Sequence, residues 1–483
     1  MPPLSRRLRG LTASVSVLIL GACTTVGPNF KAPAPPQGAA ASGYAMAGDA
    51  PAPGVQLSPE ARTAGPWWQA FGSPELDATV RQALADSPTL IEATATLQRA
   101  RANVAAVRGQ QLPQVDTSDS IQRERINIQS FGIPGFPNPT INLYSIGAAV
   151  SYDLDLFGGR RRATEQALAQ AEAEARRADA AYLTLSGNVA LQAMQIASLR
   201  AQIATVQSVV AQDQQVIDLV RAAERAGGEA PSAIVGGQAQ LAEDEALLPP
   251  LLRQLQAARH QLALLTGKSP AEWSAPDFDM AKFAVPDEIP VSLPSALVRR
   301  RPDILAAEAD LHAATAAVGV AVSNQYPDIK LSAGLTQSTI KPAQIFNYGS
   351  SGWSVLAGLT APIYHGGTLK AQRQEAEAEA RASAARYQDT VLRAFVQVSD
   401  ALAALGADQQ SIVALGNAVK SAEARARDAQ TAYRLGGGSL LDVVDAQRQL
   451  SRSRRALAEA EGQRLSDMVE LFTATAADWR TTT

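Results

Sequence analysis

The chain has few of the residues from which metal centres, redox sites and thick hydrophobic cores are made. Of its 483 residues, 5% are aromatic, three are histidines and one is a cysteine, and the formal net charge is -3. So few thiols and imidazoles leave little material for a metal or redox centre, and we expect no cofactor. The charge shows no basic surplus, which argues against nucleic acid as a partner.

The three histidines also argue against an enzyme. His260, His312 and His365 are far apart in the sequence, whereas hydrolases and metal enzymes need clusters of catalytic or ligating side chains that converge. His365 follows a predicted strand and precedes a predicted helix, which is typical of a surface position. We therefore expect no catalytic activity.

What the sequence does contain is alanine, glutamine, glutamate and arginine in long runs with helical periodicity. Residues 161–225 and 368–435 have no proline and few glycines, so each run predicts a helix of about 100 Å at 1.5 Å per residue. Return helices are expected at 232–265, where Pro249-Pro250 should bend or interrupt the helix, and at 440–472. Two further long helices are expected, at 74–112 and 294–326.

The sequence is a tandem duplication. Residues 90–115 align with 304–329 at a constant offset of 214, and Gln111 meets Gln325 in that alignment. The period is too long for a solenoid repeat and suits a pseudo-twofold fold. We predict a first repeat at 66–280, with a helix, a β-hairpin at about 114–157 and a helical hairpin at 160–266. The second repeat, at 281–476, has its β-hairpin at about 327–364 and its helical hairpin at 368–474.

The first residues have the pattern of a bacterial lipoprotein signal. Arg6, Arg7 and Arg9 precede a short apolar stretch at 11–20, and small residues lead to Cys23, the single cysteine. We predict a signal peptide at 1–22 and acylation of Cys23, which would hold the chain on a membrane surface. Residues 23–65 are rich in proline, alanine and glycine and predict an extended tether, and 477–483 form a short tail.

Segments that alternate between apolar and polar residues precede each long helix. In residues 144–156, Tyr144, Ile146 and Val150 share one face, while Ser145, Ser151 and Asp153 share the other. Residues 329–336 and 353–363 repeat the pattern, and a weaker fourth strand is expected within 115–131, where charged residues interrupt it. Such strands are typical of a transmembrane barrel, although a half-buried soluble sheet has the same alternation.

Four strands cannot form a closed barrel in a bilayer, because each open edge would leave backbone groups unpaired in hydrocarbon. Closure therefore requires other copies of the chain. Two copies would give eight strands, whose side chains nearly fill the interior, whereas three copies would give twelve strands and can leave a channel. A solvated coiled coil remains the alternative for the helices alone.

Together these features resemble the outer membrane factors of tripartite efflux systems of the RND type, the TolC-like channels, and specifically their NodT-type lipoprotein branch. The resemblance rests on Cys23 with residues 26–30 (VGPNF), Trp67-Trp68, residues 153–159 (DLDLFGG), 299–304 (RRRPDI) and 441–447 (LDVVDAQ). It implies a mostly helical homotrimer with a twelve-stranded barrel, four strands per chain, continuous with a periplasmic α-helical barrel. It also implies a periplasmic adaptor and an inner-membrane pump as partners.

The resemblance places a gate and a coupling surface at the tips of the helical hairpins. Asp442, Asp445 and Tyr433 would lie at the periplasmic constriction, where three copies of the two acids form a ring of six carboxylates. The tips that would contact the adaptor contain Arg225, Gly227, Gly228, Arg434, Gly436 and Gly437. For Asp442 a capping role is the alternative, because residues 439–442 have the sequence of a capping box.

The function expected is a passive outer-membrane conduit for drugs or other small toxic compounds, with the substrate chosen by the pump. The alternatives are a lipid-anchored periplasmic coiled-coil scaffold without a pore, and an exit duct for metal ions or secreted proteins. Ion conductance separates the scaffold from the conduits.

Overall fold

The computed structural model describes residues 25–34, 44, 57–58, 66–132, 135, 137–285, 289–290 and 297–476. The predicted signal peptide, Cys23, most of the tether and the tail 477–483 lie outside these residues. The chain divides into two compact units. Unit 1 comprises Met1–Pro33, Thr96–Glu174 and Ala306–Tyr387, and unit 2 comprises Ala34–Ala95, Ala175–Leu305 and Gln388–Thr483. Each unit therefore draws on both halves of the duplicated sequence.

The two predicted long helices are present and equal in length. They are α4 (Gly159–Arg225) and α9 (Thr368–Arg434), of 67 residues each, and both their first and their last residues differ by 209. Gln111 donates a hydrogen bond to the carbonyl oxygen of Arg160 at the start of α4, at 2.8 Å, and Gln325 donates to that of Leu369 at the start of α9, at 3.2 Å. The duplication therefore extends to individual side-chain contacts.

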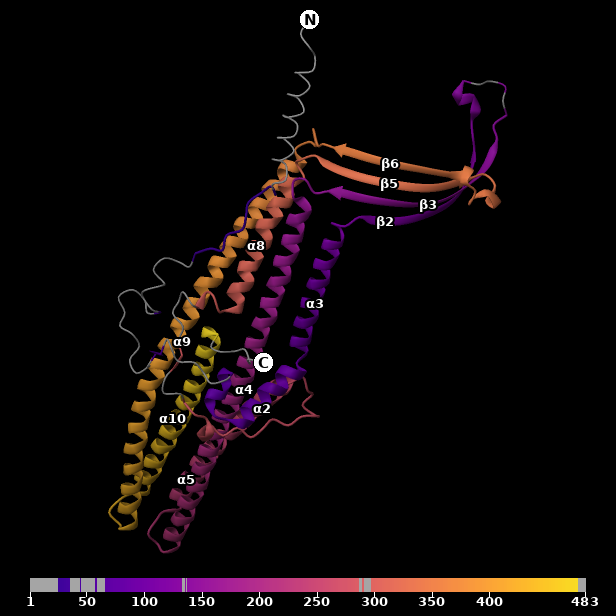
Figure 1. Ribbon diagram of the computed structural model, residues 1–483. Helices are drawn as coiled ribbons and strands as arrows, with labels where there is room; N and C mark the ends of the chain where they lie inside the picture. Colours follow the sequence, from indigo (N-terminus) through magenta and orange to yellow (C-terminus); the bar gives the residue numbers. More distant parts are fainter. Residues whose placement is uncertain are drawn as a thin grey trace. The chain divides into compact units, whose positions relative to one another are not determined.

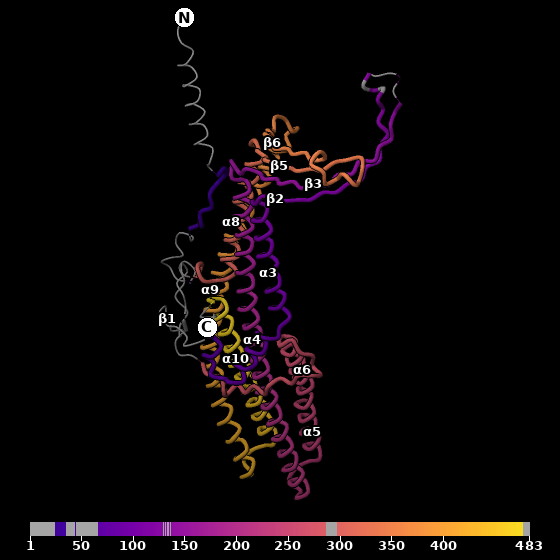
Figure 2. The backbone as a smooth tube through the Cα atoms, turned by 45° about the vertical axis from the view of Figure 1, so that its right-hand side comes forward, coloured from indigo at the N-terminus to yellow at the C-terminus, as the bar shows by residue number. Residues whose placement is uncertain are grey.

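The return helices differ between the halves. The first half has α5 (Pro231–Glu245) and α6 (Leu248–Leu265), and the second half has the single α10 (Leu440–Thr475). Pro249 and Pro250 lie in the first turn of α6, where a proline needs no hydrogen-bond acceptor. The predicted interruption is confirmed. In Figures 1 and 2, α5 returns beside α4, and α10 beside α9.

The shorter helices correct two predictions. The helix expected over 74–112 is two helices, α2 (Pro74–Asp86) and α3 (Pro88–Gly109), and the helix expected over 294–326 contains α8 at Pro302–Ser323. Ser87 between α2 and α3 is extended, with ψ 126°. A residue before proline avoids the helical region, so Pro88 and Pro302 each start a new helix.

The four predicted strands form one antiparallel sheet in unit 1 (Figure 1). They are β2 (Gln114–Arg125), β3 (Thr140–Leu154), β5 (Asp328–Thr339) and β6 (Ser351–Thr360), in the order β2-β3-β5-β6. The fourth strand, β2, is regular along its length despite its charged residues. The outer edges of β2 and β6 have no partner strand among the described residues.

The strand register separates an apolar face from a polar face. Val115, Val150, Ala333 and Val355 are directly opposite one another across all four strands. The adjacent row on the other face consists of Asp116, Ala149, Gly334 and Ser354. Directly opposed residues share a face. Along β3, β5 and β6 the alternation therefore produces a mainly apolar face and a mainly polar face, whereas β2 adds Asp119 and Arg123 to the apolar face.

The remaining regular elements are short. A two-stranded parallel sheet joins β1 (Leu57–Ser58) to β4 (Ile289–Pro290). Five 3-10 turns are described: η1 (Trp67–Phe71), η2 (Ile128–Phe131), η3 (Met280–Lys282), η4 (Pro342–Gln344) and η5 (Tyr348–Ser350).

The core of unit 2 contains a cluster of the scarce aromatic residues. Trp67, Phe71 and Phe472 are fully buried, and the rings of Trp67 and Phe472 stack with centroids 5.7 Å apart. Elsewhere small residues allow helices to approach closely. A Cβ at Gly462 of α10 would lie 2.2 Å from the hydroxyl of Ser198 on α4, which explains why long helices can pack with little apolar bulk.

Candidate functional site

The two hairpin tips have the same backbone design. Gly227 and Gly436, which follow α4 and α9, have φ angles of 78° and 75°, a region that glycine enters without steric cost. The next residues, Gly228 and Gly437, each donate a hydrogen bond five residues back, at 2.9 Å, which is the closure of a Schellman motif. Arg225 and Arg434 are the last helical residues before these turns. All six predicted tip residues are exposed.

The second tip begins α10 with a capping box. The Ser439 hydroxyl accepts a hydrogen bond from the Asp442 amide, and the Asp442 carboxylate accepts one from the Ser439 amide, both at 3.2 Å. The Ser439 hydroxyl also donates to the Asp442 carboxylate, at 2.7 Å. This hydrogen bond, followed by the one from the Ser439 amide, holds the pKa of Asp442 below its usual value. Capping is therefore one established role of Asp442.

Asp445 has no such structural role among the described contacts. It lies one helical turn beyond Asp442. Both acidic side chains are exposed, whereas Val443 between them and Ala446 just after them are buried. Neither carboxylate oxygen of Asp445 has a hydrogen-bond or ion-pair partner within the described part of the chain. The two acids thus form an exposed negative patch at the start of α10.

Tyr433 connects the two tips of one chain. Its hydroxyl donates a hydrogen bond to Glu229 in the first tip, at 3.2 Å. Its ring packs on a buried cluster formed by Val216, Val220, Leu440 and Val443. Burial, followed by the Glu229 charge, raises the pKa of Tyr433. The sequence predicted a latch at Tyr433, and the structure gives that side chain an acceptor in the same chain.

The first helical hairpin contains a buried pair of acids that the sequence analysis missed. Asp213 on α4 and Asp244 on α5 are each 8% exposed, and their carboxyl groups share a hydrogen bond. Burial and the Asp244 carboxylate raise the pKa of Asp213 to about 7. The pair therefore holds a proton in the physiological range.

A second pair of acids lies in the second hairpin, at positions that are not equivalent to those of the first pair. Asp408 on α9 hydrogen bonds Asp467 on α10, and burial and the Asp467 carboxylate raise the pKa of Asp408 to about 6. With the offset of 209, the counterparts of Asp213 and Asp244 are Ala422 and Ser453. Each hairpin therefore carries an acidic pair where the other carries small or apolar residues.

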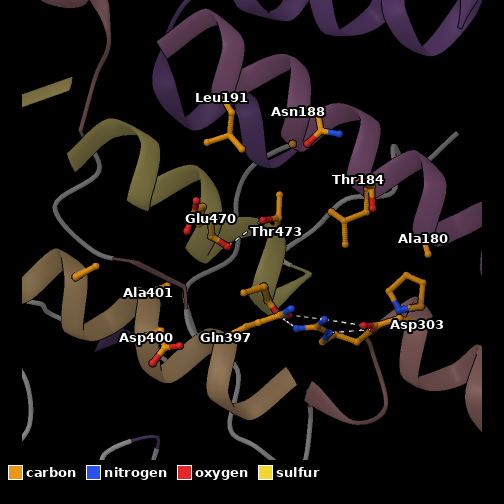
Figure 3. A pocket seen from close by; sticks show the side chains of 16 residues that line it. Ala180, Thr184, Asn188, Leu191, Asp303, Gln397, Asp400, Ala401, Glu470 and Thr473 are labelled. Atoms are coloured by element: carbon orange, nitrogen blue, oxygen red, sulfur yellow. Dashed lines mark hydrogen bonds and ion pairs between the residues drawn. The ribbon is translucent and has the colours of Figure 1, made fainter. Parts of the chain in front are cut away.

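Arg301, from the RRRPDI motif, lines a cavity of about 600 Å³ in unit 2 (Figure 3). Its guanidinium donates two hydrogen bonds to Asp303, one to Gln397 on α9 at 2.8 Å and one to the carbonyl oxygen of Ala474 on α10 at 3.0 Å. The side chain is 9% exposed. Arg301 thus joins the start of α8 to α9 and to the end of α10, which gives this motif a structural role.

The histidines do not form a common site. His312 contacts Glu165 in unit 1, with 3.0 Å between Nε2 and Oε1, whereas His260 lies on α6 in unit 2. Within the described residues, no three histidine, cysteine or acidic side chains lie close enough together to hold a metal ion.

Known proteins resemble this chain both in sequence and in fold. The family model described as outer membrane efflux protein matches residues 79–268 and 293–477. The pyoverdine export outer membrane protein OpmQ of Pseudomonas putida is 31% identical over 99% of this chain and 98% of its own. Outer membrane protein OprJ of Pseudomonas aeruginosa is 31% identical over 97% of this chain and 96% of its own. The solved structure of the outer-membrane channel OprN is 27% identical, covers 94% of this chain and 99% of its own, and has a TM-score of 0.85.

The chain belongs to the outer membrane efflux protein family. The predicted fold class is confirmed: a TolC-like outer membrane channel, mostly helical, with four strands per chain and two internal repeats. The outer-membrane location with periplasmic helices and the role as an efflux channel are confirmed as well. The names of OpmQ and OprN describe an export protein and a channel rather than enzymes.

Proposed function

We propose that this chain is the outer-membrane exit channel of a tripartite efflux assembly, in which three copies close a twelve-stranded barrel. The channel conducts small toxic compounds passively and performs no chemistry, because the energy is supplied by the pump in the inner membrane. The relatives are named for export and efflux, which supports this role.

The observation that carries the proposal is the sheet itself. Its apolar face is open in the single chain, where Trp353 is 81% and Val355 76% exposed. Its two outer edges would leave backbone groups unpaired in lipid. Joining β6 of one copy to β2 of the next satisfies both edges and turns the apolar face toward lipid. Twelve strands leave a channel, whereas eight nearly fill their own interior.

The tips supply the gate and the coupling surface in this proposal. Asp445 and the part of Asp442 not used in capping would form a ring of carboxylates at the periplasmic mouth. Tyr433 would hold the second tip against the first through Glu229. The exposed glycine turns and the arginines that precede them would contact the adaptor protein. Glycines without side chains would let the adaptor approach the backbone of both tips, at Gly227, Gly228, Gly436 and Gly437.

Acylation of Cys23 completes the proposal. The lipid would hold the mature N-terminus in the inner leaflet of the outer membrane. The mass of the mature N-terminal peptide tests this directly, since acyl chains add several hundred daltons to a peptide that begins at Cys23.

The efflux function is tested by removing the gene and restoring it. We expect the deletion strain to accumulate, and become sensitive to, small organic toxicants, and expect restored resistance when the chain is returned. A strain sensitive only to metal ions, or one that fails only to secrete proteins, would instead favour the other cargo. Unchanged export of all three classes would favour a scaffold without a pore.

Asp445→Asn is expected to weaken the cation preference of the channel. Removing three of six carboxylates at a constriction lowers the local negative potential, which concentrates cations there. We expect the ratio of cation to anion permeability in planar bilayers to fall about twofold to fivefold at low salt, where screening is weak. Asp389→Asn is the control, because Asp389 is an exposed acid on α9, 45 residues before Arg434. Equal selectivity in the two variants would remove Asp445 from the gate.

A further inference from the structure

The N-terminal segment at residues 25–30 is bound to unit 1 through an arginine that is almost fully buried. Arg162 on α4 is 3% exposed. Its guanidinium donates hydrogen bonds to the carbonyl oxygens of Val26, at 3.1 Å, and Gly27, at 3.4 Å, and to the side-chain oxygen of Asn29, at 2.6 Å. The Val26 amide in turn donates to the carbonyl oxygen of Phe157, at 3.0 Å. Four hydrogen bonds therefore hold three residues of the segment.

Two further side chains extend this contact. Glu165 accepts a hydrogen bond from Arg162, at 2.7 Å, and its other oxygen lies 3.0 Å from His312 on α8. The His312 ring stacks on Phe30, with centroids 4.4 Å apart and an interplanar angle of 14°. The same charged network that orients Arg162 thus also positions a ring for the aromatic residue of the segment.

The backbone fit is close enough to require glycine. Gly27 has a φ of 88°, and a Cβ there would lie 2.5 Å from the Cα of Gly319 on α8. A Cβ at Gly319 would lie 2.8 Å from the Arg162 side chain. The segment therefore lies in a site shaped for it, and the extended tether predicted from composition is held at its first residues by contacts that composition does not predict.

We propose that Phe157, Arg162, Glu165, His312 and Gly319 form an N-terminal dock, a site that recognises residues 25–30 and fixes the start of the mature chain to the unit that carries the strands. Three residues span at most about 10 Å. If Cys23 is acylated, as proposed above, the dock holds the lipid anchor within that distance of Val26. The lipid anchor is then fixed close to the base of the sheet, because the docked residues 25–30 lie between Cys23 and the rest of the tether.

Trypsin cleavage after Lys31 measures release of the segment. Lys31 is exposed, but a protease needs several residues around the bond in an extended and free form, so cleavage is slow while residues 25–30 are docked. We expect Gly27→Ala and Arg162→Gln each to increase the cleavage rate about tenfold or more in the full-length oligomer in detergent, followed as the appearance of a new N-terminus at Ala32. The controls are Gly367→Ala, which has a φ of 87° and open space around it, and Arg161→Gln, which removes an exposed ion pair with Asp155. Both should cleave at the wild-type rate.

Two results would overturn the dock: equal cleavage at Lys31 in Gly27→Ala, Gly367→Ala and the wild type, or rapid cleavage in the wild type. If Arg162→Gln fails to assemble, Gly27→Ala still decides, because it leaves every side chain of the dock in place. The mass of the released fragment 23–31 reports acylation separately. An unmodified fragment with slow wild-type cleavage would refute the lipid anchor and leave the dock intact.

Discussion

Val355→Arg is expected to abolish the oligomer, whereas Ser354→Arg should assemble normally. Val355 lies in the middle of β6, on the apolar face, in a row with Ala333, Val150 and Val115. Arginine on the lipid face of a barrel near the bilayer midplane costs about 2 to 4 kcal/mol. With three copies in one barrel, the cost is about 6 to 12 kcal/mol, which is comparable to the whole stability of many folded proteins.

The control is the neighbouring residue on the same strand. Ser354 points to the opposite face, in a row with Gly334 and Asp116, which faces the aqueous lumen in the proposed barrel. Migration of unheated outer-membrane extracts on denaturing gels separates intact oligomer from monomer. Loss of the oligomer in Ser354→Arg but not in Val355→Arg would reverse the assignment of the two faces, and equal tolerance of both would argue against a membrane barrel.

Asp213→Asn is expected to stabilise the first helical hairpin against local opening at alkaline pH. The pKa of Asp213 is raised from 3.8 to about 7 by burial beside Asp244. A carboxyl whose folded pKa is raised contributes stability at pH values below its unfolded pKa, and that contribution is lost as pH rises through the folded pKa. The loss therefore falls between about pH 4 and 7, and above pH 7 two adjacent buried acids carry charge.

The expected gain at pH 8 is about 2 kcal/mol. A shift of this size corresponds to about 4 kcal/mol by linkage, and we halve it because solvent near the hairpin screens the two charges even in the closed state. Amide hydrogen exchange of peptides from α5 measures such local opening. After correction for intrinsic rates, we expect exchange in Asp213→Asn to slow about 30-fold at pH 8 and little at pH 5. Asp218→Asn, an exposed acid on the same helix, should have no effect. A pH-independent change in Asp213→Asn would refute the shared proton.

Much of the fold could be predicted because its pattern is periodic. The dyad alternation in residues 144–156 and 353–363 located the sheet, and the proline-free helical runs at 161–225 and 368–435 predicted the two long helices. The helical periodicity of residues 74–112 does not predict the break at Ser87, which the proline at 88 imposes. That periodicity describes a face of a helix but not its continuity, whereas proline acts on the backbone of a single residue.

The candidate site could be predicted only where its residues are adjacent in sequence. The tip glycines and the Ser439–Asp442 capping box are local motifs, and the structure shows both geometries. The Asp213–Asp244 pair and the contacts of Arg162 with residues 26–29 join segments 31 and more than 130 residues apart. One signal for the acidic pairs was present, since Asp213 and Asp408 each break the equivalence of the two halves.

The central claim is that three copies of this chain close one barrel. Native mass spectrometry of the detergent-extracted protein counts the subunits directly. We predict a single species of three chains, that is, twelve strands at four per chain. A monomer with its sheet edges unpaired, or a dimer with an eight-stranded barrel, would contradict the account.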